Sequence, residues 1–450
     1  MFDLSLVEES RYRPFEVVSP AFVADEVAGP VGGPVSGREL HRSDHSPAAP
    51  FAAVELGSVA GEVRAGLATV DGDHLLLVRD PERGQVRIEV RTGGETHELA
   101  AVETDLADGS RLSFVLCENQ VTVLASASAD EPWEAVLTDG EGLLEHLDLR
   151  DPAILAAYTY AWGGPGELRE VRAGLFGMTG LRDPHLVQHA DGSPYVRDGL
   201  VYLTATCAGA GFFRQAHWGV FTLDLAQPRE LTQVGQLFFR RDGLLLGDHA
   251  GQVVLLDDGT WLVATSSWGD FGPQGVHVRH TTTTADVLHG VHVLETEPTP
   301  LPTRVSAWDP GLTRVDGRWF VSFVESPSQD PFDFHPALAA ARPGAAWDDG
   351  LERIGAAEDL HQCEGPVLVE LEGRHWLLAS DGDDRHYPVF DLTMRRVGRL
   401  DASYPTNIPH PQLVPLPDGG HLMVSFDGTG FGGDVLGYGG HGDVVLFRCR

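Results

Sequence analysis

The chain of 450 residues has a formal net charge of −34, because 66 acidic residues face only 32 arginines and no lysine. Such a surface repels nucleic acid and anionic membranes, so we expect neither as a partner. The hydrophobic content of 42% is ordinary for a globular protein. No apolar run approaches the roughly 18–20 residues of a membrane-spanning helix.

Residues 1–50 contain the Gly- and Pro-rich stretches "VAGPVGGPVSG" and "HRSDHSPAAP", which predict an irregular N-terminal segment. The N-terminus shows neither a basic region nor a continuous apolar segment, so we expect no signal peptide. The cysteines, at positions 117, 207, 363 and 449, have no CxxC spacing. Scattered cysteines of this kind favour reduced thiols and a cytoplasmic location.

Residues 51–164 alternate apolar and polar positions, with turn signals every 8–12 residues, as in "GQVRIEVRTGGETHELAAV" and "SRLSFVLCENQVTVLASAS". This spacing predicts an antiparallel β-sandwich. The pattern "RLSFVLCENQVTVLA" resembles the lectin-like jelly rolls that accompany carbohydrate-active enzymes. The stretch "DLRDPAILAAYTYAWGG" (148–164) is the best candidate for a helix or linker at the end of this domain.

Residues 165–450 contain five similar hairpin units at intervals of roughly 50–60 residues. Each unit has a polar head, an apolar run, a turn with Gly and a second apolar run, as in "AWDPGLTRVDGRWFVSFVES" (307–326). Repeats of strand pairs with this period predict a five-bladed β-propeller, closed by "DVVLFRCR" as an outer strand and by a strand near "REVRAGLFG". The fold class is therefore all-β, with a sandwich followed by a propeller.

The heads of three units are acidic: Asp183, Asp309 and Glu364. In a propeller the first strand of each blade lines the central axis, so these residues would meet in one funnel. Sugar hydrolysis needs a carboxyl group that protonates the leaving oxygen and a carboxylate that activates water or attacks directly. A third carboxylate nearby raises the pKa of the acid. The three heads therefore predict a glycosidase.

The motifs "RDP" (182–184), "WDP" (308–310) and "EGP" (364–366) resemble the three catalytic motifs of the five-bladed glycosidases of family 43, over residues 165–450. The resemblance implies an inverting arabinofuranosidase- or xylosidase-like enzyme, in which Asp183 is the base, Asp309 tunes the acid's pKa and Glu364 is the acid. It requires no cofactor. It also implies a possible calcium ion on the axis near His410, which has Asn407 beside it.

Two other functions fit the same sequence. The fructosidase and levansucrase families share nearly the same spacing, and there Asp183 would be a nucleophile in a retaining reaction on sucrose or fructans. A non-catalytic glycan-binding protein, with the sandwich as the lectin, is the alternative outside the enzymes. The sequence leaves the oligomeric state open.

Sugar sites stack rings on aromatic faces and satisfy hydroxyl groups with polar side chains. The expected substrate is a small oligosaccharide or glycoside. The residues predicted to contact it at the funnel are His185, Trp218, His249, Trp268, Trp308 and Arg385.

Overall fold

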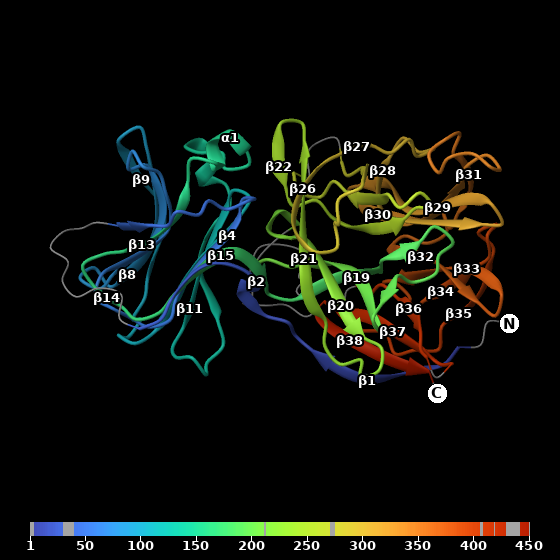
Figure 1. Cartoon of the computed structure of the whole chain (residues 1–450), viewed down its shortest axis with the longest axis horizontal. Coiled ribbons are helices and arrows are strands. Elements are labelled where there is room, and N and C mark those ends of the chain that lie inside the picture. Colours follow the sequence, from blue (N-terminus) through green and yellow to red (C-terminus); the bar gives the residue numbers. More distant parts are fainter. Residues whose placement is uncertain are drawn as a thin grey trace.

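The chain builds two lobes, and its first strand and its last strands lie in the same lobe (Figure 1). The computed structural model describes residues 4–29, 40–210, 213–270, 275–405, 408–417, 419–428 and 442–449. It is nearly all β, as predicted. The short helices are η1 (Gly142–Glu145), α1 (Pro152–Leu155) and η2 (Phe213–Gln215). No helix in these ranges is long and apolar enough to cross a membrane.

The N-terminal lobe consists of two six-stranded sheets packed face to face on one hydrophobic core. The first sheet has the order β12 (Glu134–Asp139), β11 (Gln120–Ser126), β10 (Arg111–Cys117), β4 (Phe51–Leu56), β15 (Val171–Met178), β2 (Glu16–Val27). The second has the order β3 (Leu40–Arg42), β13 (Thr159–Gly163), β6 (Val63–Ala68), β7 (His74–Asp80), β8 (Gln85–Thr92), β9 (Glu95–Glu103). A small sheet joins β5 (Val59–Ala60) to β14 (Glu167–Leu168).

The C-terminal lobe consists of five further sheets, named I to V in chain order. Sheet I contains β16 (Leu181–Leu186), β18 (Val196–Arg197), β19 (Leu200–Cys207), β20 (His217–Asp224), β21 (Thr232–Arg241), β22 (Leu244–Leu246) and β26 (Gly290–Glu295). Sheet II contains β17 (Gln188–His189), β23 (His249–Leu255), β24 (Trp261–Ser266), β25 (Val278–Thr283) and β27 (Glu297–Pro298). Sheet III contains β28 (Ser306–Val315), β29 (Arg318–Gln329), β30 (Phe332–Ala340) and β31 (Glu352–Ala356).

Sheet IV contains β32 (Cys363–Leu371), β33 (Arg374–Asp381), β34 (Pro388–Phe390) and β35 (Arg396–Arg399). Sheet V contains β36 (Gln412–Pro415), β37 (His421–Asp427), β38 (Asp443–Cys449) and β1 (Leu6–Tyr12). Separate apolar clusters join sheet I to II, II to III, III to IV, IV to V and V back to I. The five sheets therefore close into a ring, which is the arrangement of a five-bladed propeller.

The ring explains the continuous apolar runs of the sequence, because each sheet is covered on both faces by its neighbours. Tight turns join the strands of the hairpins. Asp316-Gly317 and Asp198-Gly199 both have positive φ at the two positions, as a two-residue type I′ turn requires. Asp-Gly and Glu-Gly pairs in the sequence therefore mark the hairpins correctly.

The structure corrects three predictions about the chain's organisation. The segment 1–50 is not irregular where it is described, because it contains β1, β2 and β3. The strand that closes the ring is β1, which pairs with β38, so the prediction for "REVRAGLFG" is wrong. That stretch forms β15 in the N-terminal lobe, past the predicted boundary at residue 164. The lectin-like character of this lobe stays a prediction.

Candidate active site

The inner strands of sheets I to IV share an irregularity near their heads. In β16, β23, β28 and β32 the pairing register shifts, and the residue in the bulge has positive φ. These residues are Asp183 (φ 47°), Ala250 (φ 57°), Asp309 (φ 50°) and Gly365 (φ 64°). A bulge re-aims side chains at the end of a strand. Two of the four repeats place an aspartate at this position.

Glu364 does not occupy the same position as the two aspartates. It precedes the bulge residue, so its equivalent in sheet III is Trp308. The prediction that the three acidic heads are equivalent in the repeats is therefore wrong by one residue for Glu364. The glutamate nevertheless lies beside the aspartates, because its Oε1 is 3.8 Å from Nε2 of His410.

The imidazole of His410 is the point where the three carboxylates meet. Its Nε2 lies 3.7 Å from Oδ1 of Asp183 and 3.6 Å from Oδ2 of Asp309. All four side chains are buried. The cavity beside them is lined by residues of all five sheets: Asp183, His185, Ala250, Gly251, Asp309, Gly365, Pro366, His410 and Gln412. The site therefore lies on the axis of the ring.

Asp183 is held as a carboxylate. Burial by itself raises its pKa, but the positive charges of Arg182, His410 and His249 outweigh burial and lower the pKa below its ordinary value. The guanidinium of Arg182 lies 3.9 Å from Oδ1 of Asp183 and over the ring of Phe426. Arg182 is a site residue that the sequence analysis did not single out, although it stands in the same motif.

The pKa of Asp309 is shifted in the opposite direction. Burial raises its pKa to about 7, with further increases from the negative charges of Glu364 and Asp183, although His410 opposes the change. Burial by itself lowers the pKa of His410, but Asp309, Glu364 and Asp183 outweigh it and raise the pKa to about 9. At neutral pH the cluster thus contains an imidazolium and a carboxyl group that exchanges its proton near pH 7.

Neighbouring groups hold the carboxylates by hydrogen bonds. Nε1 of Trp308 donates to Oε2 of Glu364 at 3.2 Å, and the amide of Gly365 donates to Oδ2 of Asp309 at 3.1 Å. The amide of Asp309 itself donates to Oγ of Ser266 at 3.0 Å. Ser266 could not be recognised from the sequence as a site residue, because nothing in its own strand distinguishes it from an ordinary buried serine.

Two of the predicted substrate-binding residues are histidines beside the cluster. His185 lines the cavity, its Nδ1 faces the carbonyl oxygen of Leu186 at 3.2 Å, and its buried Nε2 has no hydrogen-bond partner among the described residues. Burial lowers the pKa of His185 to about 4, so the ring is neutral. Nδ1 of His249 lies 3.4 Å from Oγ1 of Thr206.

The predicted aromatic residues divide into two groups. Trp268 packs edge-to-face on Trp308, with 5.3 Å between ring centroids, and both belong to an apolar cluster that includes Ala250 beside the cavity. Trp218 lies in the core between sheets I and II and is fully buried. The prediction that Trp218 contacts substrate is therefore wrong, since its ring packs between two sheets.

Arg385 is exposed, and its contact with Tyr404 connects it to the strand that pairs with Glu364. Its Nη2 donates to the carbonyl oxygen of Tyr404 at 3.2 Å, and the Tyr404 hydroxyl lies 2.9 Å from Oγ of Ser380. Ser380 is the cross-strand partner of Glu364. A contact between Arg385 and a substrate stays a prediction.

Asp309, Glu364 and His410 offer ligand atoms within 4.8 Å of one another, as a metal site requires. Calcium prefers six to eight oxygen ligands. This set supplies two carboxylates and an imidazole nitrogen, which is fewer oxygen ligands than calcium prefers. The fit to calcium is poor, so the axial ion stays a prediction. Asn407 lies outside the described residues.

No protein-family model and no curated protein matches the chain. Similar solved structures include levansucrase from Bacillus subtilis (TM-score 0.43, 10% identity, 60% of this chain and 83% of that chain). They also include an α-L-arabinanase from Penicillium chrysogenum (TM-score 0.37, 12% identity, 75% of this chain and 89% of that chain). A third is the GH93 α-L-arabinofuranosidase of Fusarium graminearum (TM-score 0.38, 11% identity, 77% of this chain and 91% of that chain). Likeness at this level assigns no activity to the chain.

Proposed function

We propose that this chain is a glycoside hydrolase whose N-terminal β-sandwich supports a catalytic five-bladed propeller. One observation carries the proposal: three buried carboxylates from sheets I, III and IV surround one imidazole on the axis of the ring. Burying several carboxylates together is costly unless they are paired. Pairs of titratable groups whose surroundings separate their pKa values are typical of acid–base catalysis.

Asp183 serves as the general base in this mechanism. Its pKa is lowered because Arg182, His410 and His249 outweigh the effect of burial, so the carboxylate remains ionised and can accept a proton from water. The activated water then attacks the anomeric carbon from the side opposite the leaving group, which inverts the configuration.

Glu364 serves as the general acid, and Asp309 holds a proton next to it. Ligand oxygens of the two residues lie within 4.8 Å of each other, and burial raises the pKa of Asp309 to about 7. A proton on Asp309 lowers the negative charge beside Glu364, which supports the acid role that we assign to Glu364.

The substrate class follows from the resemblance of the three motifs to family 43, which favours a furanoside or a pentoside. Within that class we propose a small oligosaccharide or glycoside as the substrate, with one sugar ring bound at the carboxylate cluster. His185, His249 and the Trp268–Trp308 pair are the side chains that we assign to contact with this ring or to the walls around it.

An ionised Asp183 favours a second candidate equally well. A carboxylate with a lowered pKa can attack the anomeric carbon directly, as in retaining enzymes that act on sucrose or fructans. The anomeric form of the first product, followed by proton NMR, separates the two candidates: the inverted form supports the pentoside hydrolase and the retained form supports the fructosidase-like enzyme.

The proposal is tested with 4-nitrophenyl α-L-arabinofuranoside, β-D-xyloside and β-D-galactofuranoside, and with sucrose. We expect the wild type to cleave one of them and Glu364→Gln to cleave it more slowly, with a smaller loss in kcat on a 4-nitrophenyl glycoside, whose leaving group is good, than on a substrate whose leaving group is poor. The control is Glu370→Gln, because Glu370 lies on the same strand and is exposed. Sugar binding without turnover in all three proteins would instead support the glycan-binding alternative.

A further inference from the structure

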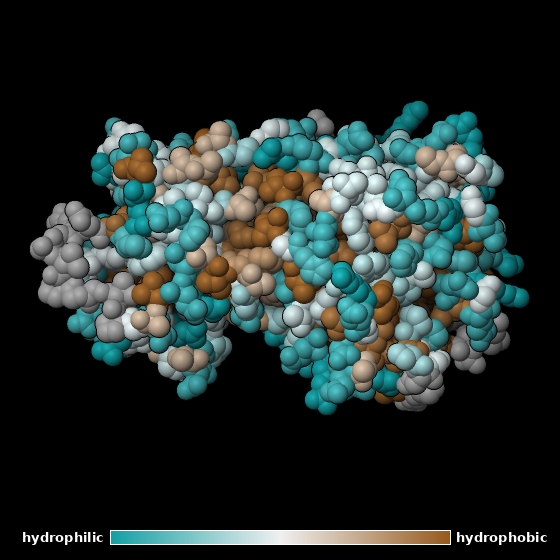
Figure 2. Space-filling model, viewed as in Figure 1, coloured by the Kyte–Doolittle hydropathy of each residue, from teal (hydrophilic) through white to brown (hydrophobic). Residues whose placement is uncertain are grey.

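The two lobes share a hydrophobic core. The main apolar cluster of the N-terminal lobe includes Ala210, Phe238 and Leu245 of sheet I and the segments next to it. Figure 2 shows apolar residues gathered at the surface where the lobes meet, and Val291 and Val293 of β26 pack against the same cluster. The N-terminal lobe therefore packs directly on the ring through a shared apolar core, rather than being joined to it by chain segments alone.

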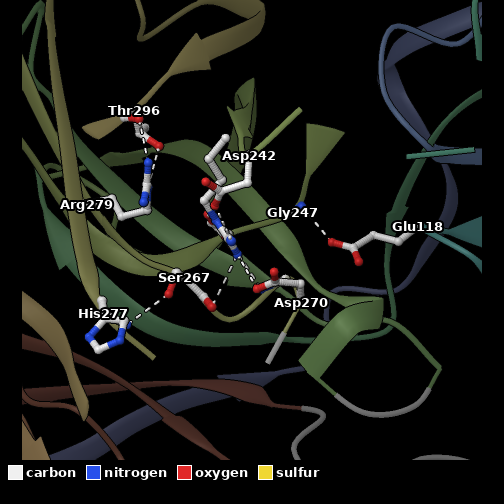
Figure 3. A network of polar contacts seen from close by, with 11 residues as sticks. Glu118, Asp242, Gly247, Ser267, Asp270, His277, Arg279 and Thr296 are labelled. Carbon is white, nitrogen blue, oxygen red and sulfur yellow. Dashed lines mark hydrogen bonds and ion pairs between the residues drawn. The ribbon is translucent and has the colours of Figure 1, made fainter. Parts of the chain in front are cut away.

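A polar side chain crosses this apolar contact. Glu118 lies in the turn between β10 and β11, where it has positive φ and is almost fully buried. Its Oε1 accepts a hydrogen bond from the amide of Gly247 at 2.9 Å. Gly247 lies two residues before His249, where β23 of sheet II begins. Oε2 of Glu118 has no hydrogen-bond partner among the described residues. Figure 3 shows this carboxylate pointing across to Gly247.

The segment that Glu118 reaches is fixed by an ion-pair network. Arg241 binds Asp248 with two hydrogen bonds of 2.6 and 2.9 Å, and it donates to Asp270 at 2.7 Å. Asp248 also accepts from the amide of Gly269 at 3.0 Å. A Cβ on Gly269 would lie 2.8 Å from Oε1 of Glu118, so residues 266–270 pack on the glutamate. These residues comprise the last residue of β24 and the turn after it, and they are called the loop 266–270 below. Ser267 and Asp270 lie together in Figure 3.

The same loop carries two groups that hold the carboxylate cluster. Oγ of Ser266 accepts a hydrogen bond from the amide of Asp309. Trp268 packs edge-to-face on Trp308, whose Nε1 binds Glu364. A continuous set of contacts therefore runs from the turn of the N-terminal lobe to two of the three carboxylates.

We infer that Glu118 is a positioning residue of the proposed active site, supplied by the N-terminal lobe. It holds the loop 266–270 in place, and the loop holds Asp309 through Ser266 and Glu364 through Trp268 and Trp308. The inference rests on the proposed function only for its kinetic readout. The position of the Trp268–Trp308 pair can be followed without any substrate.

The chemistry of Glu118 suggests the conservative variant. Burial raises the pKa of its carboxyl group well above the ordinary range, although the amide of Gly247 opposes this, and the shift favours the neutral acid. A glutamine has the same shape, accepts from Gly247 and is also neutral. Glu118→Gln should therefore preserve the contact that Glu118→Ala removes.

The experiment compares full-length Glu118→Ala, Glu118→Gln and the control Glu131→Ala, which alters an exposed residue in the next turn of the same sheet. We measure near-UV circular dichroism, kcat and KM at a temperature where every variant is folded. Trp268→Phe defines the part of the spectrum that comes from the tryptophan pair. Displacement of catalytic groups by about 1 Å can cost on the order of 100-fold in rate.

We expect Glu118→Ala to lose roughly ten- to 100-fold in kcat with little change in KM. Its difference spectrum should resemble that of Trp268→Phe, and Glu118→Gln should restore both readouts. A lowered melting temperature with wild-type kcat and spectrum would overturn the inference, because Glu118 would then only join the lobes. Equal losses in Glu118→Gln and Glu118→Ala would overturn it too.

If Glu118→Ala does not fold, Asp270→Asn tests the same loop from its partly exposed side, where it contacts Arg241. The same direction of change, at smaller size, is expected, and an unchanged spectrum and kcat would count against the inference. If the wild type hydrolyses no substrate, the proposed function fails, and the spectra alone then decide the positioning role.

Discussion

At the scale of single residues, the site depends on backbone conformations that residues other than glycine rarely adopt. Asp183 and Asp309 have positive φ, which costs a non-glycine residue on the order of 1–3 kcal/mol when the surrounding structure imposes it. The equivalent position in sheet IV is Gly365, where an added Cβ would overlap the ring of His410. The glycine thus leaves the space in which the imidazole meets the carboxylates.

This position gives a matched pair of substitutions. Positive φ alone costs alanine about 1–3 kcal/mol at this position. Gly365→Ala should lower the free energy of unfolding by more than this amount, because the overlap with His410 adds to the strain. Ala250→Gly, at the same place in sheet II, should change it by about 1 kcal/mol or less. Urea denaturation followed by tryptophan fluorescence measures both. Equal effects of the two would contradict this account of the bulge.

The charges of the cluster predict a pH dependence. The pKa of His410 in the fold, about 9, lies above the value of roughly 6.5 in an unfolded chain. Its stabilising effect is therefore complete below pH 6.5 and is lost as the pH rises through 9. Asp309 has a pKa of about 7 in the fold and of about 4 in an unfolded chain, so its stabilising effect is lost between about pH 4 and 7, mostly below the range of His410.

The free energy of unfolding should therefore fall between pH 6.5 and 9, with a slope of up to roughly 1.4 kcal/mol per pH unit from His410, and Asp309 should add to the fall only at the lower end of this range. Urea denaturation at four pH values in this window checks the prediction. His361→Gln, which alters an exposed histidine, should show the same decline. Stability that stays level or rises across the window would show that His410 is not held as an imidazolium.

At the scale of elements, β1 closes the ring, and its two faces have different surroundings. Leu6 is buried in the cluster between sheets IV and V, whereas Val7 is exposed. Leu6→Ala should cost about 2–4 kcal/mol of unfolding free energy, because it removes buried methyl groups. Val7→Ala should stay within roughly 0.5 kcal/mol. Thermal denaturation of the two variants tests the assignment, and a larger cost for Val7→Ala would contradict it.

The same element shows what the sequence could not reveal. The hairpins of the ring were predictable because a turn and two apolar runs are local features. The partner of "REVRAGLFG" was not, because a strand's own pattern does not say which sheet it joins. The misalignment of Glu364 by one residue has a similar cause. The sequence comparison aligned acidic residues with one another, whereas the bulge in the backbone makes Gly365, not Glu364, the equivalent of Asp309.

At the scale of the whole molecule, the chain begins in the ring, builds the N-terminal lobe and returns to the ring. This order places β1 beside β38 and the turn with Glu118 beside sheet II. Composition and charge restricted the classes of partner that we expected, but they could not predict how the two lobes pack on each other. Ser266 and Glu118 could be recognised as site residues only in the structure, because their partners Asp309 and Gly247 are distant from them in sequence.

The central claim is that the axial cluster performs acid–base cleavage of a glycosidic bond. The most direct measurement is the rate of wild type, Glu364→Gln and Asp183→Asn on two glycosides of one sugar, one with a good and one with a poor leaving group. The account predicts that Glu364→Gln loses far more, roughly 10²–10⁴-fold, on the poor leaving group, whereas Asp183→Asn loses similarly on both. Equal losses of Glu364→Gln on both glycosides would contradict its role as the acid.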